Sequence, residues 1–272
     1  MKLNMLYMLV VTMGYALNQN AVAGFDEGKA AFVQRDFATA IKEFTPLAEK
    51  GDARAQHILG MMYDEGQGVP QDYAKAAEWY KKAGNQGHQD SQYNLGVMHA
   101  QGQGVEHNDE ESFKWFEKAA KQGHILSQFA LGRLYTVGRG VKADGKLAND
   151  WYRKAAEQAH FKAQLALGKN YLDGNGIKKD VKLAESWIRK SAEQGHHKAQ
   201  YEMGLLYRDG IAVKKDAKQA YIWLELAAKQ DHVGAQMARD ALAKTMKADD
   251  IAAAKLAASN WQAKTPSQKS AQ

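Results

Sequence analysis

Apolar side chains recur at helical spacing through most of the chain, in short segments that glycine-containing loops separate. In the segment 53–65, Ala55, Leu59 and Tyr63 fall on one face, which predicts an amphipathic helix. Gly66 follows this segment, and glycine readily takes the left-handed conformation that ends a helix. The pattern therefore predicts a first helix that ends at Gly66.

A second helix follows in the same unit. Asp72 lies where an N-cap residue is expected, and Tyr73, Ala76 and Trp79 continue behind it at helical spacing. A short polar side chain at this position accepts hydrogen bonds from the first turn and contributes about 1 kcal/mol. Equivalent capping residues recur along the chain, at Asn108, Asp144, Asp180 and Asp216.

The helix pair repeats with a period of 36 residues. Five tryptophans keep this step, namely Trp79, Trp115, Trp151, Trp187 and Trp223. Six glutamines keep it as well, namely Gln56, Gln92, Gln128, Gln164, Gln200 and Gln236. Rows of glycine start at Gly60 and Gly66, although Ala212 replaces the second loop glycine in one unit. A fixed period of this length predicts an all-α solenoid, in which stacked helix pairs bury one another's apolar faces.

Five complete units are predicted, at residues 52–87, 88–123, 124–159, 160–195 and 196–231. Residues 24–51 read as an N-terminal helix pair without the Gly-x-Gly loop. Residues 232–262 read as a final first helix, over 233–246, and a C-terminal capping helix that begins at Asp249. The polar tail 263–272 is expected to be disordered.

Residues 1–23 have the three parts of a secretory signal peptide. They contain a basic start, an apolar run from Leu3 to Leu17, and the small-residue end Ala21-Val22-Ala23. A membrane anchor is the alternative, but it needs about 20 apolar residues and this run is shorter. We expect cleavage after Ala23, and hence a periplasmic or secreted protein whose mature chain has no membrane span.

The repeating pattern, A-Q-x-x-L-G-x-x-Y-x-x-G-x-G-V-x-x-D-x-x-x-A-x-x-W-x-x-K-A-A-x-Q-G-H, resembles the SEL-1-like repeat, a longer relative of the tetratricopeptide unit. The resemblance covers residues 24–262. It implies a right-handed superhelix of helix pairs that holds partner proteins on its inner surface, which the first helix of each unit lines. It also implies a bacterial protein of the periplasm or of the secreted fraction.

Composition and motifs exclude several kinds of catalytic and binding site. The 272 residues include no cysteine, which excludes a thiol nucleophile, disulfides and thiolate zinc sites. The Gly-x-Gly loops follow helices and lack a Gly-Lys-Ser/Thr sequence, so we expect no phosphate site. No hydrolase signature stands out from the repeats. We therefore expect no catalytic residues and no cofactor.

Histidine also recurs at the repeat step, at His88, His124, His160, His196 and His232. Equivalent positions in stacked units lie about two helix diameters apart, roughly 20 Å. Ligand nitrogens must lie about 2.0–2.1 Å from a zinc ion, so this row cannot share one. We expect these side chains to cap helices. His57, His99 and His107 stand alone in no metal-binding motif, so no metal site is predicted.

Side chains on the exposed face of the first helix of each unit vary from unit to unit. The candidates for partner binding are Arg54, His57, Met61, Tyr93, Phe129, Arg133, Lys162, Lys169, Tyr201 and Arg208. Aromatic and basic residues of this kind dominate protein interfaces. The alternative for the aromatic residues is packing against neighbouring helices.

The formal charge of +6 is unevenly distributed. Residues 24–132 carry 11 basic and 16 acidic side chains, whereas residues 133–232 carry 19 and 12. This distribution can steer a partner protein with an acidic surface toward the later repeats. The basic excess is too modest and unpatterned to indicate nucleic acid.

These features predict a periplasmic, monomeric, non-enzymatic scaffold or adaptor that binds a protein partner. The resemblance adds the alternative of an immunity protein that neutralises a phospholipase-type toxin effector. A β-lactamase-like or cell-wall hydrolase is a third alternative, but the branch of the family with β-lactamase-like activity carries paired cysteines.

Overall fold

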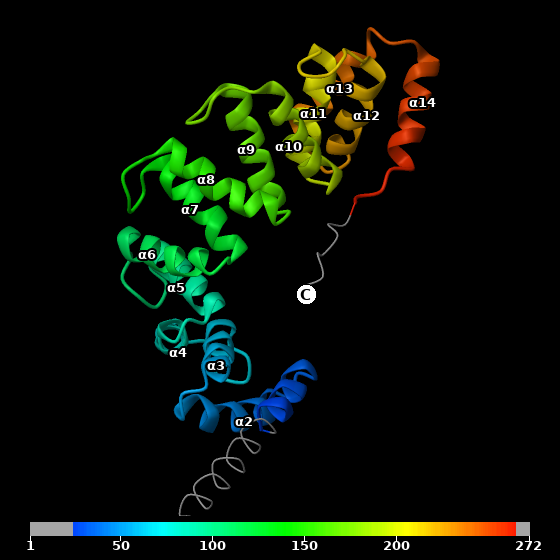
Figure 1. Ribbon diagram of the computed structural model, residues 1–272. Helices are drawn as coiled ribbons and strands as arrows, with labels where there is room; N and C mark the ends of the chain where they lie inside the picture. Colours follow the sequence, from blue (N-terminus) through cyan, green and yellow to red (C-terminus); the bar gives the residue numbers. More distant parts are fainter. Residues whose placement is uncertain (1–23, 265–272) are drawn as a thin grey trace, which may run out of the picture. The chain divides into compact units, whose positions relative to one another are not determined.

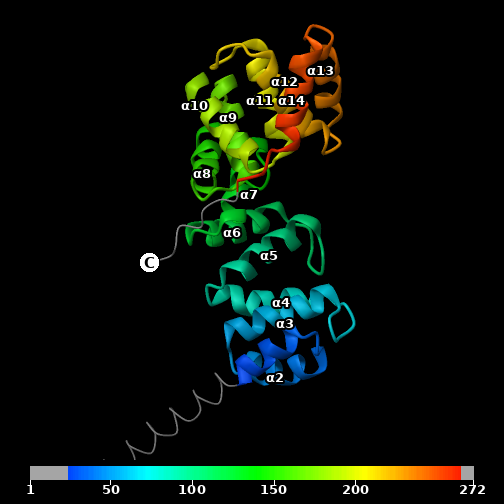
Figure 2. The ribbon, with the colours of Figure 1, turned by 90° about the vertical axis from the view of Figure 1, so that its right-hand side faces the viewer.

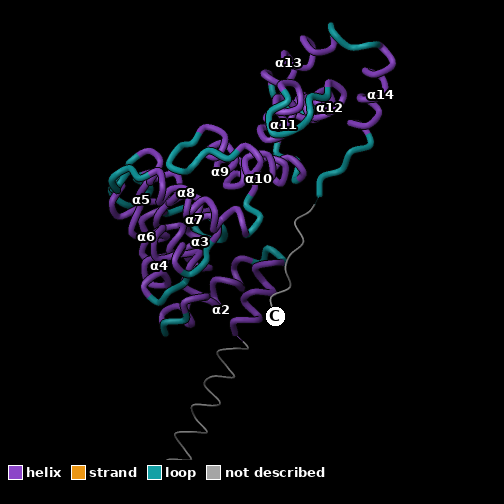
Figure 3. Tube along the Cα trace, turned by 45° about the horizontal axis from the view of Figure 1, so that its top comes forward, coloured by secondary structure: helices purple, strands orange, loops and turns teal. Residues whose placement is uncertain are grey.

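The computed structural model describes residues 24–264, and helix is the only regular secondary structure in that range (Figure 3). A helix over residues 24–33 comes first. The helices that follow are α2 (Phe37–Glu49), α3 (Ala53–Glu65), α4 (Tyr73–Asn85), α5 (Gln89–Gln101), α6 (Asp109–Lys121), α7 (Ile125–Val137), α8 (Gly145–Glu157), α9 (Phe161–Asp173), α10 (Val181–Glu193), α11 (His197–Asp209), α12 (Ala217–Ala228), α13 (Val233–Ala243) and α14 (Ala248–Ser259) (Figure 1). The predicted all-α class is confirmed.

The chain divides into two compact units, at residues 1–127 and 128–272, which we call the first and second unit. Helices from α3 to α14 alternate between two roles, so we call the odd-numbered ones A helices and the even-numbered ones B helices. Within the first unit, α2, α3, α4 and α5 pack successively against one another (Figure 2). The predicted signal peptide, residues 1–23, lies outside the described residues, as does most of the predicted tail. Within residues 24–264, no helix is both long and apolar enough to span a bilayer.

Local signals set the helix ends as predicted. The Asp72 carboxylate accepts a hydrogen bond from the Lys75 backbone N–H at 3.0 Å, which caps α4. The other four predicted capping residues act in the same way on the later B helices, namely Asn108, Asp144, Asp180 and Asp216. Gly66 ends α3 in the left-handed conformation, with φ of 69°.

Close contact between A and B helices depends on a row of glycines. A Cβ atom placed on Gly60 would lie 2.6 Å from the Tyr80 ring carbons, well inside van der Waals contact. The same approach recurs wherever an A-helix glycine faces a large B-helix residue, at Gly96 with Phe116, Gly132 with Tyr152, Gly168 with Ile188 and Gly204 with Leu224. These glycines allow the two helices of each pair to lie close together.

The buried glutamine row forms a ladder of side-chain hydrogen bonds. In the first unit, Gln56 Nε2 donates to the Ala48 carbonyl at 2.9 Å, and its Oε1 accepts from Gln86 Nε2 at 2.8 Å. Gln164 repeats the pattern with Ala156 and Gln194 in the second unit. A buried amide needs both kinds of partner, so Gln56 and Gln164 each tie their repeat to the preceding helix pair.

The C-terminal end differs from the prediction. The last A helix ends at Ala243, and α14 begins at Ala248 with Lys247 at its N-cap position and no side-chain capping bond. The prediction that Asp249 begins this helix is therefore wrong. Asp249 lies in the first turn instead, where the helix dipole favours a negative charge. Beyond α14, the Lys264 backbone N–H donates to the Glu193 carbonyl at 2.8 Å, so this part of the predicted tail lies against α10.

Candidate functional site

The aromatic candidates on the A helices pack against the histidine that precedes the next A helix. The Tyr93 and His124 ring centroids lie 5.0 Å apart in the first unit. In the second unit, Phe129 lies 4.7 Å from His160, and Tyr201 stacks on His232 at 4.6 Å. All three aromatic side chains are half-buried, and burial raises the pKa of Tyr93. These rings therefore form part of the joints between repeats, which is the alternative that the sequence left open.

His57 occupies the same position in the first complete repeat. Its ring stacks on His88 with centroids 4.4 Å apart and lies 5.6 Å from the Tyr80 ring. Burial, and then the neighbouring His88, lower the pKa of His57 to about 4. Met61 is half-buried against the cluster that contains Tyr80. Both candidates thus belong partly to the packing of the first unit.

Several of the basic candidates are already paired. Arg54 Nη2 lies 2.7 Å from the Asp52 carboxylate. Lys169 Nζ lies 2.8 Å from Glu202 Oε1, and this hydrogen bond raises the pKa of Lys169. Arg208 pairs with the adjacent Asp209 at 2.7 Å. A partner would have to compete with these carboxylates.

The second unit retains exposed cations on its A helices. Arg133, Lys162 and Lys198 are exposed, and none of them forms an ion pair within residues 24–264. Lys162 Nζ lies 5.8 Å from the centroid of the Phe161 ring. Charged side chains with no partner in the chain keep their full capacity to bind a carboxylate. Of the predicted residues, Arg133 and Lys162 therefore best fit the role of partner contact.

The prediction that the histidine row caps the A helices is confirmed at four of five positions. Side-chain Nδ1 accepts a backbone N–H bond at His88, His124, His160 and His232. At His196 the prediction is wrong, because Nδ1 instead contacts Ser191 Oγ at 3.2 Å. The residue that corresponds to Ser191 is alanine in the other four repeats, so only this repeat has a hydroxyl at that position.

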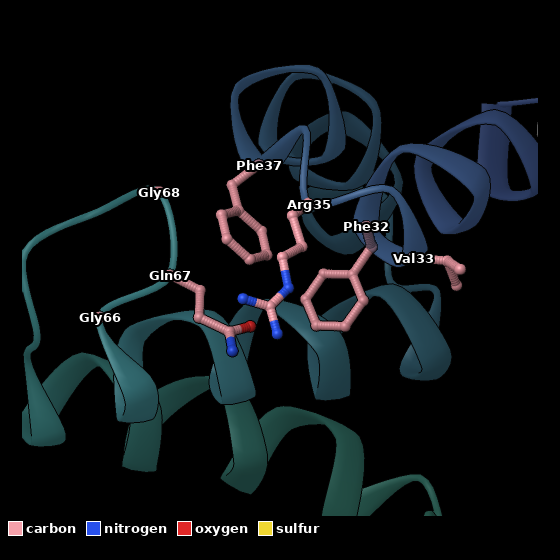
Figure 4. A pocket seen from close by; sticks show the side chains of 7 residues that line it. All are labelled: Phe32, Val33, Arg35, Phe37, Gly66, Gln67 and Gly68. Carbon is pink, nitrogen blue, oxygen red and sulfur yellow. The ribbon is translucent and has the colours of Figure 1, made fainter.

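A separate cavity of about 560 Å³ lies near the N-terminal end of the first unit. In Figure 4 the Arg35 guanidinium lies between the Phe32 and Phe37 rings and faces Gln67. Gln67 Oε1 is buried without a hydrogen-bond partner in the described part of the chain. The other lining residues are Val33, Gly66 and Gly68. Sequence reasoning missed this site, because it joins the turn before α2 to the loop after α3.

One further cluster has the chemistry of a metal site. His57, His88 and Asp90 each offer a ligand atom, and these atoms all lie within 4.8 Å of one another. These residues are not close together in the sequence, since His57 lies in one predicted repeat and His88 begins the next. Stacking of the two repeats brings them together.

The Sel1 repeat family model matches residues 53–88, 89–124, 125–160, 161–196 and 197–232. The chain belongs to the Sel1 repeat family. Each match begins one residue after the predicted boundary, at the first residue of an A helix. The family match covers well over half of the chain and accounts for the 36-residue period.

Two solved structures from the family resemble this protein. The protein c5321 is described as a protective antigen of uropathogenic Escherichia coli strains, and it is 35% identical with a TM-score of 0.82. The match covers 89% of this chain but 53% of the E. coli protein, so this Sel1 repeat protein spans about half of that length. A Sel1 repeat protein of Oxalobacter formigenes is 32% identical with a TM-score of 0.74, over 78% of this chain and 87% of the other.

An immunity protein of Pseudomonas aeruginosa, Pa5087, is 21% identical with a TM-score of 0.43, over 79% of this chain and 83% of the other. A likeness at that level carries no functional argument. The sequence matches no curated protein.

Proposed function

We propose that this Sel1 repeat protein is a non-enzymatic scaffold that binds an acidic segment of a partner protein through the A helices of its second unit. The observation that carries the proposal is the set of exposed cations without an ion pair in the described residues, namely Arg133, Lys162 and Lys198. Successive A helices present them, so an extended acidic segment can contact several repeats at once.

Charge in the second unit supports an acidic partner. Residues 133–232 carry 19 basic and 12 acidic side chains, and two A-helix carboxylates of the second unit, those of Glu202 and Asp209, are already paired. A positive surface attracts an acidic partner over a distance of about a Debye length and orients its approach. Arginine at position 133 can also bind a carboxylate through two parallel hydrogen bonds.

A pair of triple variants tests this surface. Arg133→Glu/Lys162→Glu/Lys198→Glu reverses the A-helix cations. The matched control, Lys146→Glu/Lys182→Glu/Lys218→Glu, makes the same change of net charge on exposed first-turn positions of the B helices α8, α10 and α12. Acidic residues are favourable in a first helical turn, so the control does not weaken the fold. Lys169 is left unchanged because its substitution would also break the pair with Glu202.

Each variant is immobilised and exposed to a cell-envelope extract, and captured proteins are quantified by mass spectrometry. We expect to find a partner protein that wild type and the B-helix variant capture in equal amounts and that the A-helix variant does not capture. Added salt should weaken the wild-type interaction, since the contact is electrostatic. Equal recovery by both variants would remove the assignment to the A helices.

The proposal includes export to the periplasm or beyond, through residues 1–23. The E. coli relative is described as a protective antigen, which is in keeping with an exported protein. Fractionation of the producing cells, with mass spectrometry of the intact protein, tests this part separately. A mature chain that begins at Gly24 in the periplasmic or secreted fraction supports export, and a full-length chain in the cytosol contradicts it.

A further inference from the structure

Within residues 24–264, one joint between repeats, that between the first two complete repeats, brings two histidines and a carboxylate together. His57, on α3, and His88, at the start of α5, stack with ring centroids 4.4 Å apart and an interplanar angle of 26°. Asp90 lies in the first turn of α5. One ring nitrogen from each histidine and a carboxylate oxygen lie within 4.8 Å of one another.

The repeat register explains why the cluster is unique. The residues equivalent to His57 are Tyr93, Phe129, Leu165 and Tyr201, and those equivalent to Asp90 are Leu126, Lys162, Lys198 and Gly234. The histidine at the position of His88 recurs at each later joint, as His124, His160, His196 and His232. Only this joint therefore adds a second imidazole and a carboxylate to the recurring histidine.

Both imidazoles are available as ligands at neutral pH. Metal ions bind the neutral form of histidine, which is the main form at pH 7 for an imidazole with the ordinary pKa of about 6.5. Two nitrogens on one tetrahedral zinc ion lie about 3.3 Å apart, given zinc–nitrogen distances of about 2.0–2.1 Å. The three donor atoms lie within 4.8 Å of one another, so they must close by up to about 1.5 Å through rotation of the half-buried side chains of His57 and His88 and the exposed side chain of Asp90.

Neighbouring groups already hold the three side chains in place. Ser91 Oγ contacts the Nδ1 atoms of both His57, at 2.9 Å, and His88, at 3.2 Å. Because Nδ1 of each ring is engaged with Ser91, binding of a metal through Nε2 would keep both contacts. On the other side, His124 Nε2 lies 3.2 Å from Asp90 Oδ1 and orients the carboxylate. Partners of this kind raise the affinity of a metal site by orienting its ligands.

Metal binding has one local cost. His88 Nδ1 accepts the Ser91 backbone N–H at 3.3 Å as the cap of α5. If Nε2 binds a metal, the proton moves to Nδ1, which then donates to Ser91 Oγ and no longer caps the helix. A structural zinc site contributes far more to stability than a single helix cap does, so even a weaker three-ligand site can outweigh this loss.

We propose that His57, His88 and Asp90 bind a divalent transition-metal ion, with Zn²⁺ as the best match. Two imidazoles and a carboxylate favour zinc and its neighbours over Mg²⁺ or Ca²⁺, which prefer oxygen ligands alone. Three protein ligands leave one tetrahedral position for water or for a ligand from a partner protein. The site is independent of the cations on the second unit.

Calorimetric titration with ZnCl₂ tests the proposal, on the whole protein purified without a histidine tag and treated with a chelator. The loss variants are His57→Tyr and His88→Asn. Tyrosine occupies the equivalent position at Tyr93 and Tyr201, and asparagine is a good helix cap, so both variants should keep the fold. The matched control is His160→Asn, which changes an equivalent cap far from the cluster.

Wild type and the His160→Asn control are expected to bind one zinc ion with the same affinity. Each loss variant should bind at least about tenfold more weakly, because loss of even an outer-shell partner of a metal ligand costs about 10–100-fold in affinity. Zinc should raise the thermal unfolding midpoint of wild type and not that of His57→Tyr. Absence of binding by wild type, or undiminished binding by both loss variants, would overturn the proposal.

Discussion

The glycine row between paired helices supports a quantitative prediction at Gly60. In Gly60→Ala the new Cβ atom would lie 2.6 Å from two ring carbons of Tyr80, whereas ordinary contacts lie near 3.4–4.0 Å. The Tyr80 ring cannot turn aside, because the residue is 1% exposed. The two helices must therefore separate by about 1 Å. Forced overpacking of this kind costs about 1–3 kcal/mol, and the higher helix propensity of alanine returns up to about 1 kcal/mol. We expect a net loss of about 1–2 kcal/mol in the free energy of unfolding.

Gly84→Ala provides the matched control on α4. A Cβ atom there would meet its nearest neighbours at 3.3–3.4 Å, and the equivalent residues are all alanine, namely Ala48, Ala120, Ala156, Ala192 and Ala228. This variant gains the same helix propensity with little strain, so its stability should stay equal or rise by up to about 1 kcal/mol.

Urea unfolding followed by far-ultraviolet circular dichroism measures both variants, and amide hydrogen exchange shows whether the loss is centred on α3 and α4. We expect the urea midpoint to fall for Gly60→Ala and to stay equal or rise for Gly84→Ala. A Gly60→Ala protein as stable as wild type, or an equal loss in both variants, would refute close helix approach as the reason for the glycine row.

Three more predictions concern hydrogen bonding, backbone strain and pH. Gln194→Ala leaves the buried Gln164 Oε1 without its hydrogen-bond donor, so the free energy of unfolding measured in urea should fall by about 1–3 kcal/mol. An unchanged urea midpoint would show that the glutamine ladder contributes nothing to stability. Ala212 has φ of 61° where the other four repeats have a loop glycine with positive φ, so Ala212→Gly should raise stability by up to about 1 kcal/mol. A loss of stability would contradict backbone strain at this residue. Burial lowers the pKa of His160 and His196 to about 4, below the ordinary value of about 6.5. The unfolded chain binds more protons between these pH values, so the thermal unfolding midpoint should be highest above about pH 6.5 and fall toward pH 4. The thermal unfolding midpoint of His160→Asn should fall less steeply with decreasing pH than that of wild type. Equal slopes for the two proteins would show that His160 does not cause this pH dependence.

Local chemistry made most of the fold predictable. Asp72 caps a helix through the N–H of Lys75, three residues away, and Gly66 ends one through its own backbone conformation. Such signals act between residues that are close in the chain, so they can be read before any packing is known. The prediction failed at the last helix because Asp249 has the residue type of a cap but lies within the first turn.

The candidate surface was only partly predictable. Arg133 and Lys162 are exposed as expected, whereas Lys169 pairs with Glu202 on the next A helix. The pattern of residues along one helix shows which face avoids the core. It does not show which side chain of the neighbouring repeat will meet that face, because this depends on how the helices stack.

The sequence by itself determined the helices, their caps, the 36-residue register and the family, since all of these follow from short-range preferences repeated along the chain. Only the tertiary structure decided what the rows do between repeats. The glutamine row was visible in the sequence, but only the fold shows that Gln56 donates to the Ala48 carbonyl of the preceding helix pair. His57 and His88 stood apart in the sequence and stack in the fold. Contacts between stacked repeats depend on distances and angles that no single repeat contains, and the site proposed for a metal ion lies in such a contact.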